Sequence, residues 1–190
     1  MARFSSPFGS SDASGIDTSG DDTPDDDTYD PERLPEPGPF IEDHDVLTGD
    51  DHLAFHRVTH ELFEQRGVYD VTFGYNLAEL NRDARHPDAG YRYAEDADDP
   101  SVLWAEFTPT TPFCPQSGTL TRGSFRAWNA EVDQHDYDLV RVRLAPMHNE
   151  VVAINDDLVA LEEQFEATGT VPNSPSERDD APGGSFGSPF

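Results

Sequence analysis

Apolar residues recur at helical spacing in two segments of the chain, residues 50–65 and 151–165, and a further helix is predicted over residues 115–132. Because this spacing places the apolar side chains on one face, each of the two segments predicts an amphipathic helix. Gly67 and Gly169 lie just past the first and last segments, where glycine commonly ends a helix. The apolar face of the first helix is predicted to carry Ala54, Phe55, Val58 and Leu62.

Four further segments have the composition or the alternation of strands, namely residues 68–75, 91–95, 102–108 and 139–145. The last of them alternates most clearly, with Val140, Val142 and Leu144 on one face and Arg141 and Arg143 on the other. The order helix, strands, helix, strand, helix predicts an α/β (α+β) two-layer sandwich. We therefore expect a small mixed sheet with about three helices.

Four aromatic residues are expected to form part of the core under this sheet. They are Trp104, Phe107, Phe125 and Trp128. An alternative for Trp128 is an exposed position from which it would anchor a partner.

Both ends of the chain differ in composition from its middle. Residues 1–39 are rich in Asp, Ser, Gly, Thr and Pro, and residues 168–190 form a shorter stretch of the same kind. Such segments bury too little apolar surface to fold, so they predict disordered acidic tails. Residues 40–167 then form a single globular domain of ordinary size.

The charge balance is strongly acidic, with 39 Asp and Glu against 12 basic residues, all of them Arg, and a net charge of -27. Acids spread along the whole chain predict a halophilic protein, since molar salt screens their repulsion. The excess of acids argues against nucleic acid as a partner, because nucleic-acid binding needs basic patches. No apolar run approaches the roughly 20 residues of a membrane span, and the first ten residues lack a signal-peptide core. A single cysteine excludes a disulfide framework and favours a reducing compartment, so we expect a cytoplasmic protein.

The one cysteine lies in a stiff loop between a predicted strand and a predicted helix. The loop consists of Thr108, Pro109, Thr110, Thr111, Pro112, Phe113, Cys114 and Pro115. Proline suits the first turn of a helix, so Cys114 is expected at the N-cap, where the helix dipole stabilises a thiolate and favours nucleophilic or metal-binding chemistry. The alternative is that Cys114 packs as a small buried apolar residue.

This loop carries a recognisable signature, Thr-x-Thr-x-Pro-x-Cys-Pro, at Thr108, Thr110, Pro112, Cys114 and Pro115. With the apolar strand before it and the helix, strand and helix after it, residues 67–165 resemble the PaaD/SufT-type iron-sulfur cluster assembly domain family. Some members of that family carry a histidine shortly after the second strand, and His148 stands at the corresponding place here.

The resemblance implies a non-enzymatic accessory factor of iron-sulfur cluster assembly or delivery. Cys114 would be a labile ligand of a transient cluster, His148 a candidate second ligand, and the Thr and Pro residues of the loop, Thr111 included, would support the thiol. A cluster takes four ligands, and one cysteine supplies only one of them. The remaining ligands would come from a protein partner, either an apo-client or an assembly factor, from a second copy in a homodimer, or from a small thiol.

Two other functions remain open from the residues alone. One is a thiol-dependent enzyme with Cys114 as nucleophile and His148 or His135 as base. The other is a structural or protein-interaction module that keeps the fold without cluster chemistry.

A second candidate site lies on the first predicted helix, where histidines are spaced four residues apart at His52, His56 and His60. On a helical wheel they point away from the apolar face. Two histidines at this spacing can coordinate a divalent ion such as zinc or nickel. The alternative is a set of surface residues that line a subunit interface or contact neighbouring carboxylates.

Overall fold

The structure is a computed structural model, and it describes residues 33–172. The greater part of the two predicted tails, residues 1–32 and 173–190, lies outside the described residues.

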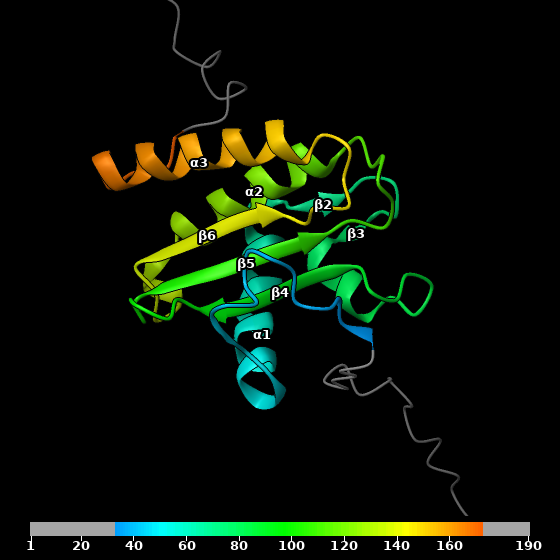
Figure 1. The fold of residues 1–190 in the computed structure, drawn as a ribbon, viewed down its shortest axis with the longest axis horizontal. Coiled ribbons are helices and arrows are strands. Elements are labelled where there is room, and N and C mark those ends of the chain that lie inside the picture. Colours follow the sequence, from blue (N-terminus) through cyan, green and yellow to red (C-terminus); the bar gives the residue numbers. More distant parts are fainter. Residues whose placement is uncertain (1–32, 173–190) are drawn as a thin grey trace, which may run out of the picture.

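A four-stranded mixed sheet forms the centre of the fold, with the strand order β1-β4-β5-β6 (Figure 1). The strands are β1 (Asp45–Val46), β4 (Gly90–Glu95), β5 (Val102–Thr108) and β6 (Leu139–Leu144). β4 and β5 are antiparallel and are joined through the acidic turn after Glu95, whereas β5 and β6 are parallel and are joined through a helix. The three longer strands confirm the segments predicted from the sequence.

Three α-helices pack around this sheet: α1 (Gly49–Arg66), α2 (Ser117–Asn129) and α3 (Val151–Thr168). α1 and α2 lie against one face of the sheet, and α3 runs beside β6 and contacts α2 (Figure 1). Gly67 and Gly169 take left-handed φ angles of 67° and 64° and end α1 and α3, as their positions in the sequence predict. The observed fold confirms the predicted α+β class, with a small mixed sheet and three helices.

The core lies between the sheet and the α1–α2 layer. Trp128 is fully buried there, with Phe63, Tyr91 and Tyr93 around it at ring-centroid distances of 5.0, 5.1 and 6.3 Å. Full burial rules out the alternative in which Trp128 is exposed. The two tyrosines satisfy their hydroxyl groups inside the core; that of Tyr91 donates to Ser124 at 2.8 Å.

The opposite face of the sheet is crossed by the segment that precedes α1 (blue in Figure 1). Leu34 and Ile41 of this segment are buried, although Leu34 belongs to the part predicted as tail. The Phe40 N–H donates to the carboxylate of Glu106, and a Cβ at Gly38 would overlap the same carboxylate. A side chain at position 38 would therefore require the buried Glu106 carboxylate to move.

Residues 68–75 do not form the single strand predicted from their Val, Tyr and Phe content. They form a tight hairpin of β2 (Tyr69–Asp70) and β3 (Tyr75–Asn76), followed by the 3-10 helix η2 (Leu77–Arg82). The Asp70 carboxylate accepts the N–H groups of Thr72 and Phe73, and Gly74 has φ 74°. These two features turn the chain where β propensity alone favours extension.

Candidate functional site

Cys114 lies in the loop between the end of β5 and the start of α2, but not at the N-cap of the helix. The N-cap residue is Gln116, and α2 begins at Ser117. The Cys114 carbonyl accepts the Ser117 N–H at 3.2 Å, which closes a short turn in place of the first helical bond. The predicted N-cap position is therefore wrong, and the thiol stands before the first turn of the helix.

His148 fixes this loop through its main chain. The ring is 3 % exposed, and its Nε2–H donates to the Cys114 carbonyl at 3.1 Å. Its Nδ1 accepts the Glu150 N–H at 3.1 Å. Because a carbonyl only accepts and an amide N–H only donates, these partners assign a neutral ring with the proton on Nε2. Both nitrogens are used, so the ring holds the Cys114 backbone and offers neither nitrogen to the sulfur.

Two further contacts fix the same region. The Asn149 N–H donates to the Pro112 carbonyl at 3.0 Å, tying the loop to the segment before α3. On the other side, the Gln116 side chain accepts the Val71 N–H at 3.2 Å and donates to the Thr72 hydroxyl. The β2–β3 hairpin therefore adjoins the cysteine loop, a juxtaposition that no sequence pattern indicated.

Cys114 is half-buried as a residue, and no side chain within residues 33–172 forms a hydrogen bond with its Sγ. Its neighbour Phe113 is 73 % exposed. Among the other loop residues, Thr111 and Pro115 are exposed, and Thr108, Thr110 and Pro112 are half-buried. The loop thus places a half-buried cysteine beside an exposed phenyl ring on a fixed backbone.

His135 is remote from this loop. Its Nε2–H donates to the carbonyl of Trp128 at 3.1 Å, and its Nδ1 accepts the Tyr137 N–H at 3.2 Å. Trp128 lies at the opposite end of α2 from Cys114, about 17 Å along the helix axis from Ser117 at 1.5 Å per residue. The arrangement of a cysteine beside a histidine base is therefore not formed with His135, and His148 has no nitrogen left for it.

Two of the three histidines of the predicted stripe do not face solvent. His52 and His56 are 1 % and 5 % exposed and stack on each other at 5.6 Å, so the expected outward orientation is wrong. His56 Nδ1 lies 2.9 Å from the Tyr93 hydroxyl and its Nε2 3.1 Å from the Ala78 carbonyl. The helical wheel failed because η2 and β4 cover this side of α1, while Ala54 on the predicted apolar face is exposed.

Burial also sets the charge of these rings. Desolvation, with help from neighbouring positive groups, lowers the pKa of His52 to about 3 and that of His56 to about 4. His60 is half-exposed and lies 2.7 Å from the carboxylate of Glu79. Within the described part of the chain, no three His, Cys, Asp or Glu residues are grouped as metal ligands.

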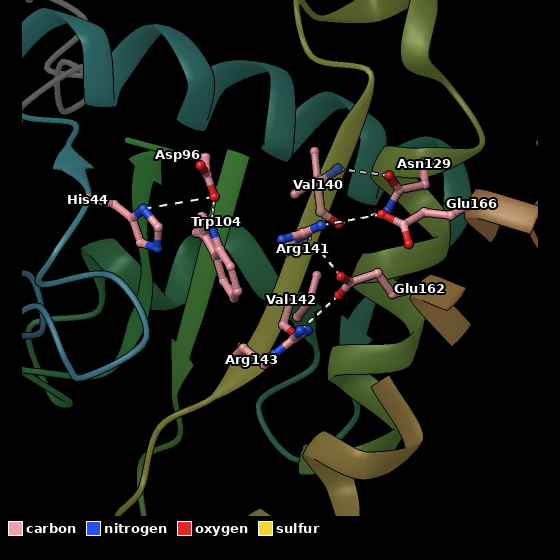
Figure 2. Close-up of polar contacts among 10 residues, drawn as sticks. All are labelled: His44, Asp96, Trp104, Asn129, Val140, Arg141, Val142, Arg143, Glu162 and Glu166. Atoms are coloured by element: carbon pink, nitrogen blue, oxygen red, sulfur yellow. Dashed lines mark hydrogen bonds and ion pairs between the residues drawn. The ribbon is translucent and has the colours of Figure 1, made fainter. Parts of the chain in front are cut away.

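Polar contacts gather on the other face of the sheet, around β6 and α3 (Figure 2). Trp104 lies there and not in the core under the sheet as expected, with the guanidinium groups of Arg141 and Arg143 at 5.3 and 5.1 Å from its ring. Arg143 donates to Glu162 at 2.8 Å, and Arg141 Nε forms an ion pair with the same carboxylate at 2.9 Å, without hydrogen-bond alignment. Alternation in β6 correctly placed the two arginines on this face.

None of the helices among residues 33–172 combines the length and hydropathy needed to cross a bilayer. A comparison with curated proteins found no match to this chain. A family model described as a domain of unknown function (DUF7998) matches residues 21–172, a range that contains all the strands and helices given above. With most of its 190 residues matched in this way, the chain belongs to the DUF7998 family.

Proposed function

We propose that this protein is a non-enzymatic accessory factor of iron-sulfur cluster assembly or delivery, acting in the cytoplasm, in which Cys114 is a labile ligand of the cluster it passes on. One observation carries the proposal. Cys114 is half-buried and its sulfur has no hydrogen-bond partner in residues 33–172, on a loop whose backbone is held by His148 and Asn149. Such a thiol is available to a metal, and the fixed loop keeps it in position.

The cluster is cargo in this proposal, and the chain supplies only part of its coordination. A cluster takes four ligands, and the protein has one cysteine and, in its described part, no grouped set of ligands. The other ligands must come from an assembly factor, an apo-client, a second copy of the chain or a small thiol. A single protein ligand is also readily exchanged, which suits delivery better than storage.

The geometry favours binding over turnover. A cysteine nucleophile needs a base within about 3 Å, and neither nitrogen of His148 or His135 is free for that task. The signature of the cysteine loop and the order of elements around it support the iron-sulfur role, through the resemblance described above.

A second candidate is a protein-interaction module, favoured by one specific observation. Phe113, beside the thiol, is 73 % exposed, although burying a phenyl ring is favourable by about 1.5–3 kcal/mol. A ring presented in this way would contact a partner whether or not a cluster is carried.

Anaerobic iron-sulfur reconstitution at molar salt, with wild type beside Cys114→Ser, tests the leading proposal. The wild type should acquire the visible absorbance of a cluster together with iron and sulfide, and Cys114→Ser should lose all three. His148→Gln is the control that keeps the thiol and removes its support, and we expect this variant to bind the cluster but to release it faster.

The same experiment separates the two candidates. Phe113→Ala should retain the cluster, since it leaves the thiol in place. Equal iron in wild type and Cys114→Ser, or none in either, would refute cluster carriage by this thiol. A partner whose binding is lost in Phe113→Ala and kept in Cys114→Ser would then favour the interaction module.

A further inference from the structure

A cavity, unrelated to the cysteine loop, lies where the segment before α1 meets the start of that helix. Its volume is 400 Å³, within the range of sites that hold small ligands. Leu34, Pro35 and Pro37 form an apolar wall. Thr48 and Gly49, at the N-terminus of α1, and Arg92 of β4 supply polar groups.

Arg92 is the unusual member of this lining. It is 8 % exposed, yet among residues 33–172 no carboxylate pairs with its guanidinium and no acceptor receives its Nε–H. Arginine keeps its charge in proteins, and a buried charge without a partner costs several kcal/mol. The other buried arginine on the same face of the sheet, Arg143, has Glu162 as its partner. The buried positive charge of Arg92 is therefore not balanced by a negative group among residues 33–172, and a bound anion would balance it.

The start of α1 provides further donors for an anion. Thr48 is the N-cap residue, but its side chain makes no capping hydrogen bond, so the first N–H groups of this 18-residue helix have no side-chain acceptor among residues 33–172. Gly49 has φ 55°, a conformation that glycine adopts without strain. Free N–H groups and the positive end of the helix dipole favour a negative group at this position.

We propose that this cavity binds a small organic carboxylate. The planar fork of Arg92 matches a carboxylate in a two-point contact, the N–H groups at the start of α1 add donors, and the proline and leucine wall covers the apolar part of the acid. A multiply charged phosphate fits less well, because Glu36 lines the same cavity and Asp50 and Asp51 stand in the first turn of the helix.

Amide NMR titration of the full chain with sodium butyrate, at constant sodium concentration and molar salt, tests this site. The signals of Thr48, Gly49 and Asp50 and the Arg92 Nε–H should shift saturably, and the uncharged analogue n-butanol should not shift them. Arg92→Gln should weaken butyrate binding by at least about tenfold, the loss expected for one charge-assisted hydrogen bond. Arg85→Gln, which removes an exposed arginine paired with Asp83, is the matched control and should bind as the wild type does.

Arg92→Lys keeps the charge and loses the fork, so it tests the site even if Arg92→Gln fails to fold; its affinity should lie between those of Arg92→Gln and wild type. Glu36→Gln should bind butyrate at least as tightly as the wild type. Binding seen only in Glu36→Gln would mean that Glu36 itself fills the site and would overturn the proposal. Unsaturable shifts, or equal affinity in Arg92→Gln and wild type, would overturn it as well.

Discussion

His56 is enclosed by protein, and both of its ring nitrogens have partners, the Tyr93 hydroxyl and the Ala78 carbonyl. The Ala78 carbonyl can only accept, so it takes the one proton of the neutral ring at Nε2 and leaves Nδ1 beside the Tyr93 hydroxyl. Desolvation accordingly lowers the pKa of His56 to about 4, from 6.5 in an exposed histidine. The ring ties α1 to β4 and η2, and burial makes its charged form unfavourable.

A pH dependence of stability follows from this shift. The unfolded chain takes up the proton near pH 6.5 and the folded chain only near pH 4, so stability is complete above pH 6.5 and falls as the pH drops toward 4. The loss from His56 is on the order of 3 kcal/mol at pH 4, and His52 acts in the same direction. Urea unfolding between pH 7.5 and 5, at fixed salt, should therefore show a decline that is shallower in His56→Gln.

His60→Gln is the control for that measurement, because His60 lies on the same helix and is half-exposed. It should decline as the wild type does. An unchanged slope in His56→Gln would show that this ring does not set the pH response.

The carboxylate of Glu162 on α3 links this helix to the arginines of β6. Glu162 and Arg143 are 7 % and 8 % exposed, and Arg141 joins them from the next outward position on the strand (Figure 2). Two arginines facing one buried carboxylate make that carboxylate hard to remove, because the charges left behind remain desolvated.

Glu162→Ala should lower the free energy of unfolding by about 3 kcal/mol, as expected when one partner of a buried ion pair is removed. Urea unfolding at neutral pH measures it. Glu166→Ala, which removes the exposed partner of Arg141, should cost less than about 1 kcal/mol. Equal effects of the two substitutions would mean that the Glu162 contact behaves as a surface pair, and Glu162→Gln would then separate loss of charge from loss of contact.

The elements that the sequence predicted well are those in which one physical signal dominates. β6 alternates strictly, and Gly67 and Gly169 end their helices in the left-handed conformation. The hairpin at residues 69–76 was missed because its turn depends on the Asp70 side chain, which overrides the strand propensity around it. The burial of His52 was missed because it depends on elements distant in sequence, which a helical wheel does not contain.

The same distinction applies to the candidate sites. Composition and the loop signature singled out Cys114 and, through the resemblance, His148, and the structure brings these two together through a main-chain hydrogen bond. The cavity beside Arg92 had no signal in the sequence, since it depends on three segments that meet only in the fold.

For the whole molecule, the net charge of -27 predicts a strong dependence on salt. Raising NaCl from about 0.1 M to about 1 M shortens the Debye length from about 10 Å to about 3 Å, which screens acidic repulsion that is densest in the folded state. The free energy of unfolding should rise over this range. Sucrose at matched osmolality, which does not screen charge, should reproduce only a small part of the rise, and a flat response to NaCl would contradict the halophilic interpretation.

The parallel pairing of β5 with β6 also has a consequence for the chain as it leaves the ribosome. β5 is complete at Thr108, but its partner begins only at Leu139, after the whole of α2 has been made. During that interval the β5 edge, with Leu103, Ala105 and Phe107 along it, has no neighbour on one side. An open apolar strand edge pairs readily with other chains, so nascent chains of this topology are prone to aggregate. In the folded protein β6 covers this edge and the risk is removed.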